Sequence, residues 1–311
     1  MRLLAPLLML LPALAFTLVS TLGATLAAAP AWAAEQRTLR HDGRDRRYVV
    51  EFPQAPGPRP AVIVFHGAGG TAARIRGYTD LGLSDEGWVE VYPDAVGRLW
   101  SDGRAALSGG LLRRGDDVGF VRALVAELVA ERRVDPDRVF FAGVSNGGAM
   151  TLLVLCQAPE LAAGAAVAIM TQPVGIDCPA GPPVPLMFVL GTADPLVPFG
   201  GGVIRVRGQD RFGVHSADET LAFYARRNRC DGGAAERRLA DRAPDDGTRV
   251  RLVEYRGCAA PLLAFIVEGG GHSWPGASVP PLIDRLLGRT SRDISATDEI
   301  EGFLRRLVGE R

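Results

Sequence analysis

The segment from residue 138 to residue 155 constrains the fold of this chain most strongly. A run of β-branched and aromatic residues stops at a Gly-x-Ser-x-Gly motif, Gly143 to Gly147, and an apolar stretch typical of a helix follows directly. A serine between a buried strand and a helix must sit in a tight, strained turn, and the flanking glycines let the neighbouring strand and helix pass without side-chain clashes. This context makes Ser145 a candidate nucleophile, whereas the motif alone is common.

Buried strands predict the architecture around this motif. Short all-apolar runs occur at 61–65, 165–170, 185–190 and 262–267. Such runs are typical of strands covered on both faces in a mostly parallel sheet. Helical spacing of apolar residues from Val121 onward, with Asp116 or Asp117 as the N-cap, predicts one of the helices that flank the sheet. Polar residues fill 231–246, where we expect a surface loop.

Two of these runs are followed by residues that can complete a catalytic site. Asp194 follows one run, and His272 follows another behind glycines that we expect to let its ring swing over the serine. The carboxyl ends of parallel strands meet at one edge of a sheet, so Ser145, Asp194 and His272 are predicted to lie together. The other histidine after the serine, His215, is expected in a loop that no strand precedes. The chain order Ser, Asp, His is that of α/β-hydrolases.

A glycine-rich loop after the run 61–65 supplies a second chemical feature. Backbone N–H groups in such a loop can converge on one point, as an oxyanion hole requires, and we assign the donors as the N–H groups of Ala68 and Asn146. A phosphate-binding loop or a plain tight turn is the alternative, although the Lys-Ser/Thr ending of a P-loop is missing. His66, in the same loop, is expected to form structural hydrogen bonds.

Together these parts predict acyl transfer to water through a serine nucleophile. Neutral His272 removes the proton of Ser145 as its oxygen attacks a carbonyl, while Asp194 orients the ring and stabilises the imidazolium. The two backbone donors hold the oxyanion, and water then resolves the covalent acyl-enzyme.

The N-terminus has the pattern of an export signal. Residues 1–33 combine an early arginine, a long apolar run and an Ala-x-Ala site, so we predict a signal peptide there and a single α/β domain over 34–311. An uncleaved membrane anchor is the alternative because the run is long, although Pro6, Pro12 and Gly23 argue against a clean spanning helix. Either way we expect the domain to be secreted, into the periplasm or the medium.

Export gives the cysteines a role, because disulfides form in oxidising compartments. Cys156, Cys178, Cys230 and Cys258 allow three connectivities, of which the sequential one, 156 with 178 and 230 with 258, is favoured. A metal site is the weaker alternative, since no Cys-x-x-Cys spacing or neighbouring histidine supports it. The 35 basic and 35 acidic side chains give a net charge of +0, so neither a nucleic-acid partner nor an anionic membrane partner is expected.

Four motifs carry a resemblance to a known group of enzymes. They are Gly143-Val-Ser145-Asn-Gly-Gly148, Asp116-Asp-Val-Gly-Phe120, Gly191-Thr-Ala-Asp194-Pro and Gly270-Gly-His272-Ser-Trp-Pro-Gly276. Together they resemble the secreted polyhydroxybutyrate depolymerase and feruloyl esterase group of α/β-hydrolases, over roughly residues 40–308. The resemblance implies an α/β-hydrolase fold with little or no lid, esterase activity on extracellular carboxylic esters, no cofactor, and Ser145, Asp194 and His272 as the triad.

Two departures from the group refine the expected substrate. Its depolymerases often carry cysteine where this chain has Ala68, and they add a polymer-binding domain that we do not find here. We therefore expect a soluble or oligomeric ester, with a feruloyl or acetyl esterase of plant polysaccharides as the alternative. A peptidase or lipase would share the triad, and a noncatalytic surface-binding module is a further alternative. Trp100 and Trp274 either form an aromatic wall for a substrate ring or simply pack inside the fold.

Overall fold

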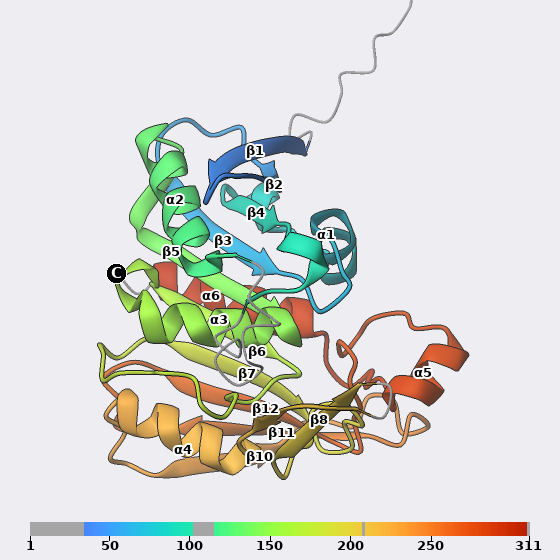
Figure 1. Cartoon of the computed structure of the whole chain (residues 1–311). Coiled ribbons are helices and arrows are strands. Elements are labelled where there is room, and N and C mark those ends of the chain that lie inside the picture. The colour runs from blue at the N-terminus through green and yellow to red at the C-terminus, as the bar shows by residue number, and fades with distance from the viewer. Residues whose placement is uncertain (1–33, 102–114, 207–208, 310–311) are drawn as a thin grey trace, which may run out of the picture. The chain divides into compact units, whose positions relative to one another are not determined.

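The structure, a computed structural model, describes residues 34–101, 115–206 and 209–309. The predicted signal peptide at 1–33 lies outside these residues. A ten-stranded sheet forms the centre (Figure 1). Its strands in chain order are β1 (Glu35–His41), β2 (Arg44–Glu51), β3 (Arg59–Phe65), β4 (Val89–Pro93), β5 (Val134–Val144), β6 (Gly164–Ala168), β7 (Leu186–Gly191), β10 (Ala234–Arg238), β11 (Arg249–Tyr255) and β12 (Leu262–Glu268). A separate two-stranded sheet pairs β8 (Gly202–Val206) with β9 (Gln209–Val214).

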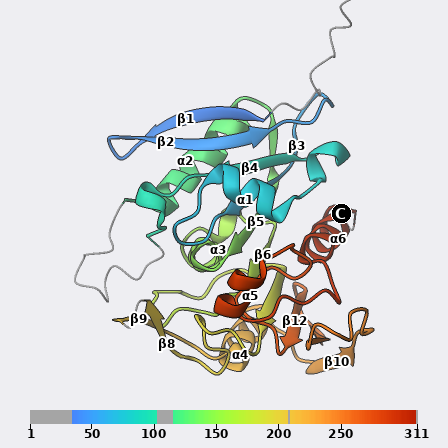
Figure 2. The same ribbon diagram turned by 90° about the vertical axis from the view of Figure 1, so that its right-hand side faces the viewer.

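The strand order explains how distant parts of the chain reach one edge. It is β1-β2-β4-β3-β5-β6-β7-β12-β11-β10, parallel from β4 to β12 and antiparallel in the pairs at both margins. The predicted fold class, α/β with a mostly parallel central sheet, is therefore confirmed. Because parallel strands share a direction, the carboxyl ends of β3, β5, β7 and β12 lie at the same edge. Figure 2 looks toward that edge.

Helices cover both faces of the sheet. The helices α2 (Asp117–Ala130), α3 (Asn146–Gln157) and α4 (Ala217–Arg227) lie on one face, and α1 (Ala72–Thr79) and α6 (Ala296–Gly309) lie on the other (Figure 1). Two buried apolar clusters result: within β3, Ile63 belongs to the first, while Val62 and Val64 belong to the second. A strand covered on both faces has no polar alternation, which is why its sequence is continuously apolar.

The segment 231–246, expected to be a surface loop, contains the edge strand β10. This strand pairs antiparallel with β11, but most of its side chains are exposed on both faces. Its sequence therefore lacks the alternation of apolar and polar residues by which a half-buried strand is recognised. Polar, charged side chains at a sheet margin also discourage pairing with other chains.

Two disulfides brace the fold on one side of the sheet. Cys156, near the end of α3, bonds to Cys178 on the segment that leads to β7. Cys230, just after α4, bonds to Cys258 between β11 and β12. The connectivity is thus the sequential one that the sequence favours. Across the part of the chain that the structure describes, no helix is both long and apolar enough to cross a bilayer.

Candidate active site

Ser145 sits at the turn between β5 and α3. Its φ of 56° and ψ of −119° place a residue with a side chain in a region that suits glycine, as in a nucleophile elbow. The motif glycines are required by close approach: a Cβ at Gly143 would overlap the backbone of Gly147, and a Cβ at Gly147 would overlap the carbonyl of Phe65. The N–H of Ser145 donates to the carbonyl of Ala168 at 3.0 Å, so the turn is tied to the end of β6.

The three side chains predicted to act together are in hydrogen-bond contact. His272 Nε2 lies 3.0 Å from Ser145 Oγ, and His272 Nδ1 lies 2.7 Å from Asp194 Oδ2. A neutral ring with its proton on Nδ1 satisfies both contacts, because the carboxylate accepts that proton and Nε2 accepts the hydroxyl proton. The side chains of His272 and Asp194 are 9% and 3% exposed, so the pair is largely shielded from water.

Backbone donors fix the carboxylate of Asp194. Its Oδ1 accepts from the N–H of Leu196 at 2.7 Å and from the N–H of Val197 at 2.8 Å. An aspartate that bonds the backbone two and three positions later stabilises its own turn. The other oxygen, Oδ2, is thereby aimed at His272.

The loop that carries His272 is held by the chain around α5 (Pro281–Leu287). The N–H of His272 donates to the carbonyl of Leu287 at 2.5 Å, and the N–H of Gly271 donates to the carbonyl of Arg289 at 2.8 Å. A Cβ at Gly271 would overlap Leu287 and Gly288. The glycines before the histidine thus serve close packing in a fixed loop, whereas we expected them to let the ring swing.

The predicted oxyanion donors lie on the two segments that border the serine, the loop after β3 and the start of α3. A Cβ at Gly67 would come within 3.5 Å of Ser145 Cβ, so the loop after β3, which includes Ala68, runs beside the nucleophile. Asn146 is the first residue of α3, where the backbone N–H groups of a helix carry partial positive charge. Both positions suit stabilisation of an oxyanion next to Ser145.

His66 occupies the structural role expected of it. Its Nε2 accepts from the N–H of Ala95 at 3.1 Å, which leaves the proton on Nδ1, 2.7 Å from the carbonyl of Gly67. Burial lowers the pKa of His66, since the charged ring would lose its hydration. The ring therefore stays neutral and bridges two loops.

Of the two interpretations of Trp100 and Trp274, packing inside the fold is confirmed, and the aromatic wall for a substrate is wrong. Trp100 is 1% exposed and Trp274 is 3% exposed, so neither presents a ring face to a substrate. The indole of Trp274 instead donates to Thr297 Oγ1 at 3.1 Å. The exposed aromatic residue nearby is Tyr78, whose ring centroid lies 6.2 Å from that of Trp274. Tyr78 lies on α1, far from Trp274 in the sequence, so no local sequence pattern predicts that the two rings are neighbours.

Asp117 has a role that sequence reasoning missed. Asp116 is the N-cap of α2, accepting from the N–H of Gly119 at 2.9 Å, which leaves Asp117 facing the interior. There it forms a buried ion pair with Arg46 of β2 at 2.6 Å. Its other oxygen accepts from the N–H of Ser101 at 2.7 Å. The signal available in the sequence, an acidic pair before a helix, indicates capping alone.

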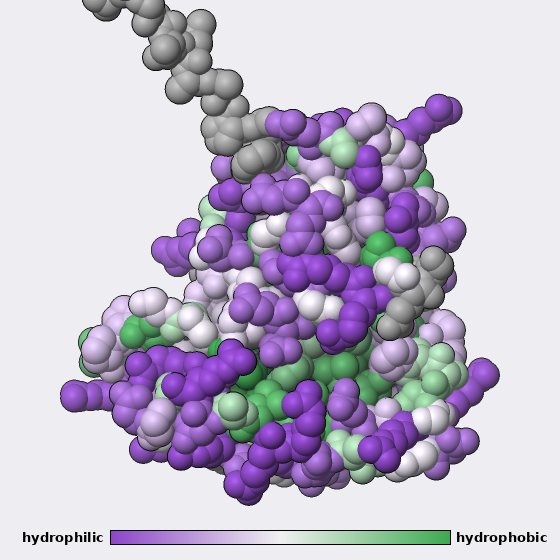
Figure 3. Space-filling model, turned by 180° about the vertical axis from the view of Figure 1, so that it is seen from behind, coloured by the Kyte–Doolittle hydropathy of each residue, from purple (hydrophilic) through white to green (hydrophobic). Residues whose placement is uncertain are grey.

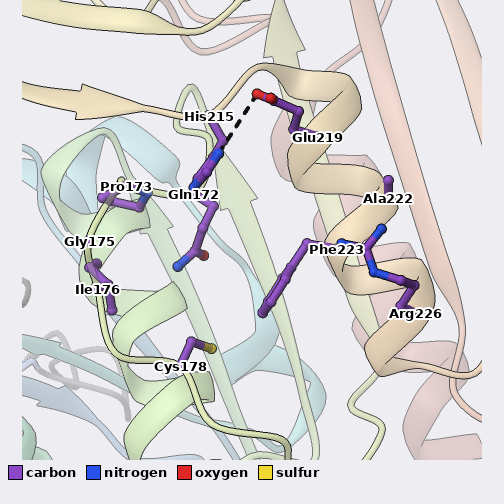
Figure 4. Close-up of a pocket in the computed structure, with 10 residues that line it drawn as sticks. All are labelled: Gln172, Pro173, Gly175, Ile176, Cys178, His215, Glu219, Ala222, Phe223 and Arg226. Carbon is purple, nitrogen blue, oxygen red and sulfur yellow. Dashed lines mark ion pairs between the residues drawn. The ribbon is translucent and has the colours of Figure 1, made fainter.

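His215 lies away from the triad, as expected, but for a different reason. It directly follows β9, whereas no preceding strand was expected, and that strand belongs to the small separate sheet. Its Nδ1 lies 3.8 Å from Glu219 at the mouth of a cavity of about 420 Å³ between α4 and the segment 172–178 (Figure 4). No triad residue lines this cavity.

A second cavity, of about 630 Å³, lies between β11, β12 and α6. Figure 3 shows apolar surface bordered by hydrophilic side chains in this region of the back face. The triad contributes nothing to its lining either. Among the residues that the structure describes, no cluster of three or more His, Cys, Asp or Glu side chains could hold a metal ion.

Comparison with known families places the chain among ester hydrolases. The model of the dienelactone hydrolase family matches residues 47–207. A relative from Nocardia uniformis subsp. tsuyamanensis, named as a candidate esterase NocK, is 32% identical over 84% of this chain and 80% of its own length. Feruloyl esterase B of Piromyces equi is 25% identical over 73% of this chain and 42% of its own length.

Two further comparisons are more partial. A poly(3-hydroxybutyrate) depolymerase from Ralstonia pickettii is 33% identical over 42% of this chain, and the match spans 27% of that enzyme. Among solved structures, acetyl xylan esterase from Aspergillus awamori superposes with a TM-score of 0.55 at 18% identity, over 78% of this chain and 94% of that one. At 18% identity the superposition shows a shared fold and nothing about function.

Proposed function

This chain belongs to the dienelactone hydrolase family and is a carboxylic ester hydrolase, and we propose that it is a secreted serine esterase with Ser145, His272 and Asp194 as its triad. The observation that carries the proposal is the continuous hydrogen-bonded path from the hydroxyl through the imidazole to the carboxylate, at 3.0 and 2.7 Å. Strained backbone at Ser145 supports it, because such strain gathers at functional sites.

The proposed reaction proceeds in two acyl-transfer steps. His272 accepts the proton of Ser145 as Oγ bonds to the ester carbonyl carbon, and the carbonyl electrons move to the oxygen, which the N–H groups of Ala68 and Asn146 stabilise. Collapse of this intermediate breaks the bond to the alcohol oxygen, which takes the proton from His272. Water then attacks the acyl-enzyme by the same route and releases the acid. The base must be neutral to begin, because only an unprotonated Nε2 can accept the hydroxyl proton.

A soluble or oligomeric ester of a hydroxy acid, of the polyhydroxybutyrate type, is the substrate we favour, with feruloyl or acetyl esters as the second candidate. The motif resemblance and the similarity to a poly(3-hydroxybutyrate) depolymerase support the first. The similarity to a feruloyl esterase supports the second. The two disulfides suit an oxidising compartment, which supports secretion.

A substrate panel and one substitution test the proposal. Purified wild-type protein is assayed on a 3-hydroxybutyrate trimer, methyl ferulate and a p-nitrophenyl acetate ester, beside Ser145→Ala and the control Ser278→Ala, whose serine is exposed after the histidine loop. We expect Ser145→Ala to lower kcat by at least about 10⁴-fold on every substrate that is cleaved. A fluorophosphonate probe should label wild type and the control alone. Turnover that persists in Ser145→Ala would remove the serine from this role.

A further inference from the structure

One buried residue, Trp100, connects the two segments that carry the proposed oxyanion donors. The indole Nε1–H of Trp100 donates to the carbonyl of His66 at 2.9 Å, in the loop after β3. The backbone N–H of Trp100 donates to Asn146 Oδ1 at 2.8 Å, at the start of α3. All three residues are buried, so these bonds form without competing water. Trp100 therefore spans the gap between the two donor-bearing segments.

Further contacts hold Trp100 in place. Its ring packs edge-on against Phe65, with centroids 5.1 Å apart. The next residue, Ser101, donates its N–H to Asp117, and Asp117 is paired with Arg46 inside the protein. This ion pair anchors the segment to α2 and β2. A displacement of the indole would have to break packing and hydrogen bonds together.

The carbonyl of Gly67 fixes the direction of the N–H of Ala68, because the two groups belong to the same peptide bond. The carbonyl of Gly67 accepts from His66 Nδ1 at 2.7 Å and from the N–H of Gly70 at 3.0 Å. In a trans peptide the N–H on the far side of the bond points the opposite way, so the N–H of Ala68 points away from His66. The carbonyl that Trp100 holds is one residue earlier, at His66. Trp100 thus fixes the position of the peptide next to the donor.

We propose that Trp100 is a positioning residue that sets the spacing between the two oxyanion donors, the N–H of Ala68 and the N–H of Asn146. Donors stabilise an oxyanion only when both reach it at hydrogen-bond distance, and misplacement by about 1 Å can lower a rate by about 100-fold. The inference rests on the proposed function, since it assigns a role within that mechanism. Trp100 touches no substrate in this assignment and acts through the two segments.

The test substitutes Trp100→Phe, which keeps an aromatic ring and removes the indole N–H. Trp88→Phe is the matched control, because Trp88 is also buried and packs on a phenylalanine, Phe140, in the other core cluster. Each protein is assayed on a methyl ester and on its thiono analogue, in which sulfur replaces the carbonyl oxygen. Sulfur is a poor acceptor, so the preference for the oxygen ester reports the oxyanion donors specifically.

For Trp100→Phe we expect kcat on the oxygen ester to fall about 10- to 100-fold with KM nearly unchanged, and the oxygen-to-sulfur ratio of kcat/KM to fall at least about fivefold. Trp88→Phe should keep the wild-type ratio even if its Tm falls. Asn146→Ala provides a second arm: it keeps the backbone N–H donor and removes the side chain that holds Trp100, so the same fall in the ratio is expected. Circular dichroism checks that each variant is folded.

Two results would overturn the inference while leaving the proposed function standing. One is a wild-type ratio in a folded Trp100→Phe protein. The other, if Trp100→Phe does not fold, is a wild-type ratio in Asn146→Ala. Absence of esterase activity in the wild-type protein, by contrast, would count against the proposed function itself. The wild-type assay therefore separates the two failures.

Discussion

At the scale of single residues, Ser145 shows what the site requires of the backbone. A serine with φ near 56° has its Cβ crowded against the backbone, a conformation that costs on the order of 1–3 kcal/mol. The close approaches of Gly143 and Gly147 prevent the turn from relaxing. The turn therefore stores strain at the position that we assign to the nucleophile.

This strain predicts that two inactive variants differ in stability. Ser145→Gly removes the Cβ and relieves the strained turn, whereas Ser145→Ala keeps the Cβ and the strain. Allowing for the greater freedom of glycine in the unfolded chain, we expect the glycine variant to be more stable than the alanine variant by about 1 kcal/mol. Urea denaturation of the two proteins measures the difference. A more stable alanine variant would show that the turn is relaxed.

The meeting of Ser145, Asp194 and His272 could be predicted from the sequence because each lies in the turn or loop that follows a buried strand. The network around Trp100 could not, because its contacts lie far apart in the chain: Trp100 and Asn146 are separated by 46 positions. Asp117 was misread for a related reason, since its partner Arg46 is 71 positions away. Local sequence patterns therefore identify the candidate catalytic side chains, whereas the residues that position them, such as Trp100, are found only in the folded structure.

At the scale of elements, the position of His272 depends on its neighbouring segment. The loop after β12 reaches the serine because its backbone is bonded to the end of α5 and to Arg289. Gly271 and Gly288 make this docking possible, since their backbones nearly touch. Placement of the imidazole is thus a property of two packed segments.

Gly271→Ala is expected to displace this loop. A Cβ at Gly271 would overlap the carbonyl of Leu287, so the histidine would move and kcat would fall about 100-fold. Gly77→Ala, in α1, is the matched control, because a Cβ there meets nothing within 4 Å. Steady-state kinetics of both variants give the comparison, and equal kcat values would contradict the proposed docking.

Helices and strands could be predicted where their burial produces a recognisable pattern of apolar residues in the sequence. The parallel strands are continuously apolar, and α4 begins with a capping box at Ser216 and Glu219. The helix α1 escaped notice because it buries few residues, Ala72, Ile75 and Thr79 among them. The strand β10 escaped because it is polar on both faces. Elements at the margins of a fold leave the weakest signal.

At the scale of the whole molecule, a buried carboxyl group makes stability depend on pH. Burial raises the pKa of Glu90 to about 7, because its charged form loses hydration, although Tyr92 and the N–H of Ser84 donate to it. The folded protein thus binds this proton more tightly than the unfolded chain does. Between the ordinary value of 4.5 and 7, the contribution of Glu90 to the unfolding free energy falls as pH rises.

Replacing Glu90 by glutamine should remove this contribution. Between pH 5 and pH 8 we expect wild type to lose roughly 2–3 kcal/mol of unfolding free energy relative to Glu90→Gln. Urea denaturation of both proteins at the two pH values provides the measurement. Parallel changes in the two proteins would mean that Glu90 is already charged in the folded state at pH 5.

The two edge strands of the large sheet, β1 and β10, carry many charged side chains. Arg37 and Arg40 project from β1, and Glu236, Arg237 and Arg238 project from β10. If a strand of another chain paired with either edge, these charged side chains would lose part of their hydration. This cost opposes the growth of fibrils from both edges of the sheet. Under the proposed secretion the folded protein meets no cytoplasmic chaperones, so its own edge strands have to supply this barrier to aggregation.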